Sequence, residues 1–294
     1  MEIFYVKRCM LSTTKYGKPF ADVLLVDLQG SELSCYVWDA SVNFQGAVIG
    51  SLLRPVVNSS GFSSLRASDI VACNYYTLST LPEELAIFRD CFPKIPSRDQ
   101  FCGLVHTLLD SYREDIRYGA FIVRLLDNVL DSVYAAYARS TAAKKYHHAY
   151  PGGLAQHIYE MLSMYSSIRR SLPFTVDDVL CVSGILFHDW GKIDEYTPEG
   201  DLLETAILTP HSVRSAELVY VNFSSVLDRR DMELLQHIIY SHHGSFDAGA
   251  PCLPSTIEAV VVSSLDSLSA FGDALMQTPS MGYVSMLQRK CVKS

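Results

Sequence analysis

The hydrophobic pattern of this chain changes once, between residues 76 and 98, and this change limits the fold more than any other feature. Before it, residues 1–75 contain short, apolar, β-branched segments separated by turn residues. The segments FADVLLVDLQG (20–30) and SELSCYVWDA (31–40) are joined through the turn-rich tetrapeptide Asp27-Leu28-Gln29-Gly30. About five such strands in so short a stretch predict a small barrel or sandwich.

From about residue 100 onward, the apolar residues recur at helical spacing and strand signals fade. We therefore predict three parts. They are a small OB-like β-barrel over 1–75, a linker over 76–98, and an all-α helical bundle over 99–294. A length of 294 residues also fits two domains.

Composition excludes several classes of protein. A hydrophobic content of 49% is enough for buried cores, and the net charge of −8 leaves no broad basic face for nucleic acid. The eight cysteines are widely spaced without a Cys-x-x-Cys pair, which predicts reduced thiols in a cytoplasmic protein. No signal-peptide layout is present. We also expect no apolar run of the ~18–20 residues that a membrane helix requires.

Polar residues that can bind metals occupy positions where the predicted helices should be apolar. In GLAQHIYEMLSMYSSI, His157 lies on the apolar stripe with Leu154, Ile158 and Met161. A second helix, opening at Thr175, leads to a His-Asp pair, and two later helices repeat the pattern. The residues concerned are His188, Asp189, His242 and Asp266.

A single inward histidine is more often a hydrogen-bonded core residue than a ligand. Five inward residues of ligand type, each near a helix end, point instead to a shared ion. A buried carboxylate without compensation is costly, so Asp189 and Asp266 require cations or dense hydrogen bonding. Carboxylates and imidazoles without a thiolate suit Mn²⁺, Fe²⁺, Mg²⁺ or Zn²⁺, with Ni²⁺ a further alternative.

These residues carry a family resemblance. The order His157, His188-Asp189, Asp266 resembles the HD phosphohydrolase superfamily. The strings AAKKYHHAYPGGLAQH, LFHDWGKIDEY, SHHGSFDAGAPCLPSTIEA and SSLDSLSA resemble the HD domain of the YhaM-type 3′–5′ exoribonucleases. The N-terminal GKPFADVLLVDLQGSELSCYVWD is similar to the OB-fold module of that family, so the resemblance covers nearly the whole chain.

The resemblance implies a phosphodiesterase with two divalent metal ions, of which Mn²⁺ is favoured. His157, His188, Asp189 and Asp266 would bind the first ion. Asp189 would act in catalysis as the bridge to the second ion, which His211 and His242 would also bind. Two such ions, about 3.5–4 Å apart, can activate water and stabilise a leaving oxygen. Without the resemblance, His211 could equally be an exposed histidine of a first helical turn.

Further residues are candidate substrate contacts, each with a structural alternative. Lys192 could act on a substrate phosphate or be a solvated lysine at a helix end. Trp38 could stack on a base or fill the barrel core. The other candidates are Lys145, His147, His148 and His243, of which His243 is expected to turn away from the inward stripe.

The leading hypothesis is a metal-dependent 3′–5′ exonuclease on single-stranded RNA or DNA. The first alternative is an HD phosphohydrolase of small nucleotides or short oligonucleotides. It suits residues 1–75, which hold six basic and six acidic side chains and predict weak, salt-insensitive binding. The second alternative is a non-catalytic nucleic-acid or protein-binding module. Homo-oligomerisation stays open.

Overall fold

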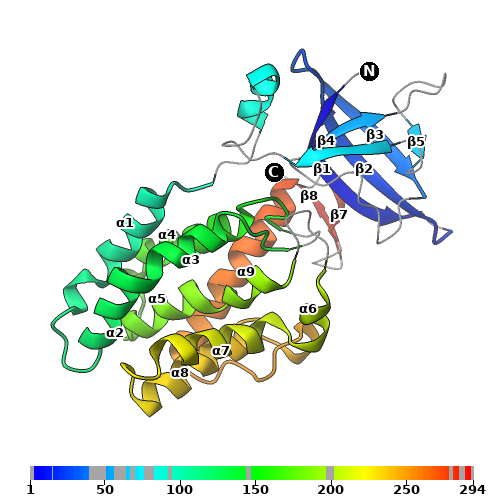
Figure 1. Ribbon diagram of the computed structural model, residues 1–294. Helices are drawn as coiled ribbons and strands as arrows, with labels where there is room; N and C mark the ends of the chain where they lie inside the picture. The colour runs from blue at the N-terminus through cyan, green and yellow to red at the C-terminus, as the bar shows by residue number, and fades with distance from the viewer. Residues whose placement is uncertain are drawn as a thin grey trace. The chain divides into compact units, whose positions relative to one another are not determined.

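The chain divides into two compact units in a computed structural model (Figure 1). Unit 1 comprises 1–94 with 149–151, and unit 2 comprises 95–148 and 152–294. The structure describes residues 3–14, 16–39, 51–55, 64–66, 70–75, 83–91, 95–143, 147–196, 202–277, 281–284 and 289–292. The predicted domain bounds stay predictions, and the division after Lys94 falls inside the predicted linker.

Unit 1 is built on one sheet, with strand order β5-β3-β2-β1-β4-β6. The pairing of β3 with β5 is parallel, and the other pairings are antiparallel. The strands are β1 (Phe4–Thr13), β2 (Pro19–Val26), β3 (Glu32–Trp38), β4 (Ser51–Pro55), β5 (Ser64–Arg66) and β6 (Ile70–Tyr75). A β unit ahead of a helical bundle is therefore confirmed, and closure of this sheet into an OB-like barrel stays a prediction.

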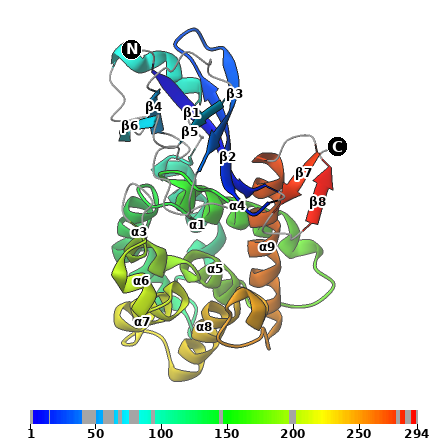
Figure 2. The ribbon, with the colours of Figure 1, turned by 90° about the vertical axis from the view of Figure 1, so that its right-hand side faces the viewer.

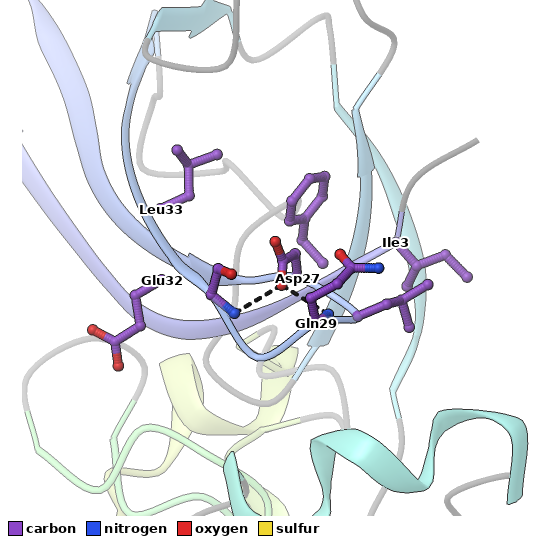
Figure 3. Close-up of a pocket in the computed structure, with 8 residues that line it drawn as sticks. Ile3, Asp27, Gln29, Glu32 and Leu33 are labelled. Carbon is purple, nitrogen blue, oxygen red and sulfur yellow. Dashed lines mark hydrogen bonds between the residues drawn. The ribbon is translucent and has the colours of Figure 1, made fainter.

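The turn between β2 and β3 lies at the predicted tetrapeptide. The Oδ1 atom of Asp27 accepts hydrogen bonds from the main-chain N–H groups of Gln29 and Ser31, both at 2.8 Å. Gly30 has φ 80°, a left-handed conformation that favours glycine. Figure 3 shows this turn beside a pocket of about 260 Å³ lined by Ile3, Asp27, Gln29, Glu32 and Leu33, among others.

Unit 2 is a helical bundle with a continuous apolar core. Helix α9 packs against α4, α5 and α8, and both ribbon views show it running along the bundle (Figures 1 and 2). The helices are α1 (Arg98–Leu109), α2 (Gly119–Arg124), α3 (Leu130–Tyr137), α4 (Gly153–Ile168), α5 (Asp178–Phe187), α6 (Glu204–Leu208), α7 (His211–Phe223), α8 (Arg229–Ser241) and α9 (Ile257–Gln277).

Helix α9 corrects the expectation about apolar runs. Its segment Ile257–Met276 has 20 residues and a mean hydropathy of 1.3, which is long and apolar enough to cross a membrane. The core helix of a globular protein passes the same test. Helix α9 contacts three other helices of the bundle and carries the predicted ligand Asp266. We therefore interpret it as a core helix.

Two local predictions are also corrected. The second predicted helix begins at Asp178 and not at Thr175, because Asp177 caps it by accepting hydrogen bonds from two main-chain N–H groups. The helical region also ends in an antiparallel hairpin that the sequence analysis did not predict. Its strands are β7 (Met281–Val284) and β8 (Arg289–Val292).

Candidate metal centre

Three helix ends and two helix interiors bring the predicted ligands together in unit 2. His157 lies on α4 and is buried, as its apolar stripe predicts. His188 caps the C-terminus of α5, and Asp189 follows it; both are also buried. His211 begins α7 and His242 caps the C-terminus of α8, while Asp266 lies on α9.

The two carboxylate oxygens of Asp189 face different groups of imidazoles. Oδ2 lies 3.4 Å from Nε2 of His188 and 3.9 Å from Nε2 of His157. Oδ1 lies 3.4 Å from Nε2 of His211 and 3.6 Å from Nε2 of His242. The carboxylate therefore stands between two sets of possible ligands, one on each side.

Asp266 belongs to the first of these sets. Its Oδ1 atom lies 3.2 Å from Nε2 of His157 and 4.0 Å from Nε2 of His188. We call His157, His188, Asp266 and Oδ2 of Asp189 the first half-site. The second half-site consists of His211, His242 and Oδ1 of Asp189.

Several buried atoms of this centre lack a hydrogen-bond partner among the described residues. They are Nε2 of His157, His188 and His242, together with Oδ1 of Asp189. Unsatisfied buried polar atoms are costly, so a group of them converging on one place indicates a ligand. Imidazole nitrogens and carboxylate oxygens are the donors that divalent transition metals accept. The residues present thus fit a metal ion in each half-site.

The opposite nitrogens of two of these imidazoles are bound to the main chain. Nδ1 of His188 lies 3.0 Å from the carbonyl oxygen of Ile185, and Nδ1 of His242 lies 2.6 Å from that of Ile239. A carbonyl oxygen only accepts, so Nδ1 donates in both rings and the Nε2 lone pair is free for an ion.

The electrostatics of the first half-site favour charged carboxylates. Burial alone would raise the pKa of Asp189, but the Lys192 ammonium and His188 outweigh it and hold the pKa well below its usual value. Burial likewise opposes ionisation of Asp266, while the neighbouring imidazoles of His157 and His188 lower its pKa. Both groups therefore offer anionic oxygens at neutral pH.

Burial keeps two of the histidines, His157 and His242, in the neutral form. Burial lowers the pKa of His157, although the neighbouring Asp266 carboxylate partly opposes this. It also lowers the pKa of His242 well below the usual value, with His243 adding to the effect. Both rings are thus neutral near pH 7 and keep the lone pair that metal coordination requires.

Lys192 differs from the solvated alternative. Its side chain is 9% exposed, and its Nζ lies 2.7 Å from Oδ2 of Asp189. Burial alone would lower the pKa of Lys192, but the Asp189 carboxylate outweighs burial and raises it. Oδ2 of Asp189 belongs to the first half-site. The Lys192 ammonium therefore lies close enough to contact a group that binds there.

His243 was expected to turn away from the inward stripe, and this expectation is wrong. Its Nε2 lies 3.3 Å from Nε2 of His211, and its ring centroid lies 4.0 Å from that of His242. Gly244 has φ 76° and breaks the helical geometry directly after it. The chain leaves helical geometry at the end of α8, so helical spacing does not predict where His243 points.

His147 and His148 are buried beside the first half-site. Their ring centroids lie 5.2 and 5.4 Å from that of His157. Nε2 of His148 lies 3.1 Å from Oε2 of Glu160 and is thereby held on α4. Of the two histidines, His147 remains the candidate for a substrate contact.

Two candidates remain, Lys145 and Trp38. Lys145 falls outside the described residues. Trp38 lies in unit 1, where its side chain is 38% exposed, so the alternative that it fills a barrel core is wrong. Its ring centroid lies 5.5 Å from that of Phe20 and 6.0 Å from that of Tyr36, and these three rings form an aromatic group on β2 and β3.

Sequence reasoning missed three side chains that support the centre. Glu195 contacts His211, while Ser269 contacts His157 and also Glu160. Helical spacing could have found two of them. Glu160 lies three residues after the ligand His157, and Ser269 lies three residues after the ligand Asp266, so each shares a helical face with a ligand.

Gly191 allows α7 to approach the centre closely, and we predict that Gly191→Ala weakens the second half-site. An added Cβ would lie 2.3 Å from the carbonyl oxygen of His211 and 2.8 Å from Cβ of Arg214. The start of α7 must then move, and His211 moves with it. We expect a loss of about 10-fold or more in affinity for one metal ion, measured by calorimetry.

Gly103→Ala is the matched control. It lies within α1, where an added Cβ meets no atom within 4 Å, so alanine should raise stability by about 0.5–1 kcal/mol and leave metal binding unchanged. Equal metal affinities in the two variants would contradict the role given to Gly191.

Comparisons with known proteins agree with this geometry. Residues 154–270 match the HD domain family, a span that includes all six predicted ligands. The chain is 29% identical over 271 residues to the 3′-5′ exoribonuclease YhaM of Bacillus pumilus. The matched region covers 86% of this chain and 79% of that protein. No solved structure matches the chain.

Proposed function

Since residues 154–270 of this chain match the HD domain family, we propose that it is a metal-dependent phosphodiesterase. The HD domain and the similarity to an exoribonuclease support a metal-dependent phosphohydrolase. The finer proposal is a 3′–5′ exonuclease that removes nucleotides from single-stranded RNA, with single-stranded DNA as a second substrate.

One observation carries this proposal. The two oxygens of Asp189 face two separate sets of buried imidazole nitrogens, at 3.4–3.9 Å on one side and 3.4–3.6 Å on the other. A shared carboxylate between two sets of neutral and anionic ligands supports a centre for two ions. Such centres suit in-line displacement at phosphorus, where charge develops on both the attacking and the leaving oxygen.

The residues take the following roles in the proposal. His157, His188, Asp189 and Asp266 would bind the first ion, and Asp189, His211 and His242 the second, with Mn²⁺ favoured for both. When bound, such ions would supply an activated water and neutralise the oxygens of the phosphodiester. Lys192 donates to a phosphate oxygen, since its ammonium already lies beside Oδ2 of Asp189.

Digestion of an end-labelled oligonucleotide tests the activity. A 5′-labelled 20-mer of RNA, incubated with the protein and Mn²⁺, should give a ladder of descending length. A 3′-phosphorylated copy is the control for the direction of attack and should be cut more slowly. Absence of any ladder across Mn²⁺, Mg²⁺, Fe²⁺, Zn²⁺ and Ni²⁺ would rule out the exonuclease.

A length series separates this proposal from the small-nucleotide alternative. Oligonucleotides of two to twenty residues, together with mononucleotide substrates, are compared by kcat/KM. Turnover that is highest on dinucleotides or mononucleotides would favour the alternative. Turnover that rises with length supports the exonuclease.

The aromatic group of unit 1 supports binding of a single strand, and we predict that Trp38→Ala weakens it. Stacking contributes about 1–3 kcal/mol per base, so affinity for a long single strand should fall about 5- to 150-fold. Fluorescence anisotropy measures this change, and turnover of dinucleotides should stay unchanged.

Tyr16→Ala is the control, because Tyr16 is 79% exposed and lies outside the aromatic group. If both variants bind long RNA as tightly as the unaltered protein, the aromatic group has no part in binding.

The proposed location is the cytoplasm. The thiols of Cys35, Cys102 and Cys181 are free and buried, which suits a reducing compartment.

A further inference from the structure

Two of the four imidazoles of the centre are held at Nδ1 by side chains, whereas the other two are held by main-chain carbonyl groups. Nδ1 of His157 lies 3.0 Å from Oγ of Ser269. Nδ1 of His211 lies 3.3 and 3.4 Å from the two carboxylate oxygens of Glu195. Each half-site therefore contains one histidine whose orientation depends on a replaceable side chain.

The hydroxyl group of Ser269 connects His157 to the carboxylate of Glu160, whose side chain is 35% exposed. It donates its proton to Oε2 of Glu160 at 2.7 Å. A hydroxyl has one proton, so towards His157 this oxygen only accepts, and Nδ1 of His157 must donate. This fixes the tautomer in which Nε2 carries the lone pair and faces the first half-site.

Glu160 is itself held in place from several sides. It accepts a hydrogen bond from Gln156 at 2.8 Å and lies 3.1 Å from Nε2 of His148. Burial alone would raise its pKa, but the hydrogen bonds from His148, Gln156 and Ser269 outweigh burial and lower the pKa to about 2. Glu160 is therefore ionised at neutral pH and accepts from all three neighbours.

The backbone of His148 shows that this support is built into the fold. His148 has φ 46°, an uncommon value for a residue other than glycine. Its main-chain N–H donates to Asp273 at 2.6 Å, and its carbonyl oxygen would lie 1.9 Å from a Cβ at Gly153. A strained backbone conformation persists only where surrounding contacts hold it. Here these contacts orient the His148 imidazole towards Glu160.

Glu195 supports the second half-site directly. Its side chain is 12% exposed, and its carboxylate contacts the Nδ1 side of His211, opposite the Nε2 atom that faces Asp189. A carboxylate accepts, so Nδ1 of His211 donates and Nε2 is left with its lone pair. In each half-site, one histidine is thus supported on its Nδ1 side by a glutamate, directly by Glu195 or through Ser269 by Glu160.

We propose that Glu160 and Glu195 are positioning residues, each of which sets the affinity of one half-site for its metal ion. Glu160 acts through Ser269 on His157, and Glu195 acts on His211. The inference rests on the proposed function, because it assumes that both half-sites bind metal. Neither glutamate is among the proposed metal ligands or the candidate substrate contacts.

Titration of the metal-free protein with Mn²⁺ alone tests this proposal. The unaltered chain should bind two ions by calorimetry and give the spin-coupled resonance spectrum of a Mn²⁺ pair. We expect an affinity for one Mn²⁺ ion that is about 10- to 100-fold lower in each of three variants, Glu160→Gln, Ser269→Ala and Glu195→Gln. At limiting Mn²⁺, the coupled spectrum should be replaced by that of a single ion.

Double variants identify which ion each glutamate supports. Glu160→Gln combined with His211→Ala should lose both ions, whereas Glu160→Gln combined with His157→Ala should lose only the first. Glu195→Gln should show the reverse pattern. Loss of both ions from each single glutamate variant would overturn the assignment to separate half-sites.

Glu233→Gln is the matched control, because this glutamate on α8 is 48% exposed and pairs with Arg229. Thermal unfolding in the presence of a chelator shows whether each variant is folded before metal is added. Affinities in the Glu160 and Glu195 variants equal to those of the control would overturn the inference. If the unaltered chain binds no divalent ion, the proposed function itself is wrong.

Discussion

Asp189→Asn should abolish hydrolysis, with a fall in kcat/KM on the order of 10³-fold or more. The carboxylate of Asp189 faces both half-sites, since its Oδ2 lies 3.4 Å from Nε2 of His188 and its Oδ1 lies 3.4 Å from Nε2 of His211. An amide removes the negative charge and offers one acceptor instead of two. Calorimetry with Mn²⁺ should show that affinity falls at both half-sites, and the 5′-labelled RNA should stay intact.

The buried ammonium of Lys192 requires a control in this experiment. Asp189→Asn leaves Nζ of Lys192 without its carboxylate partner, so the single variant should also lose stability. Asp189→Asn combined with Lys192→Met removes both charges and should recover the stability without recovering metal binding. Activity within 10-fold of the unaltered protein in either variant would refute the bridging role.

Arg117→Ala should destabilise unit 2 by about 1–3 kcal/mol, the largest effect on stability that we predict, because Arg117 is 47% exposed while its partner Asp231 is buried. Nε of Arg117 donates to Asp231 at 2.8 Å, and Nη2 donates to the second oxygen of the same carboxylate. Nη1 contacts Asp177, the N-cap of α5, at 3.2 Å. Asp231 is 1% exposed, so loss of the guanidinium leaves a buried carboxylate without its cation.

Thermal unfolding followed by circular dichroism at 222 nm measures this loss, which should lower Tm by roughly 2–12 °C. Arg113→Ala is the matched control, because Arg113 pairs with the half-exposed Asp110 and Asp127 and should cost about 1 kcal/mol or less. Arg117→Ala combined with Asp231→Asn should recover part of the loss. Equal Tm values for the two single arginine variants would contradict this account.

Periodicity in the sequence was enough to find most of the candidate centre. His157 lies on an apolar stripe of α4, and that stripe is buried in the structure. His242 and Asp266 follow the same rule on α8 and α9. Inward direction is a local property of a helix, because every residue advances by about 100° around the axis. His211 came from the family resemblance, since its position in a first turn gave no preference for either environment.

Supporting contacts and surface aromatics could not be read in the same way. Glu160 reaches His157 only through Ser269, which comes from a helix more than 100 residues later in the chain. His243 turns towards His211 because the chain leaves helical geometry at Gly244. Trp38 is exposed because alternate residues of β3 face opposite sides of the sheet, and the sequence does not state which side is covered.

The sequence by itself determined the order of the two folding patterns and the residue types that converge on the metal centre. Apart from His211, both follow from local patterns, which each helix or strand carries within its own residues. Only the tertiary structure decided that one oxygen of Asp189 faces each set of histidines and that a glutamate stands behind each set. Those facts depend on distances between α4, α5, α7, α8 and α9, and packing of the helices sets these distances.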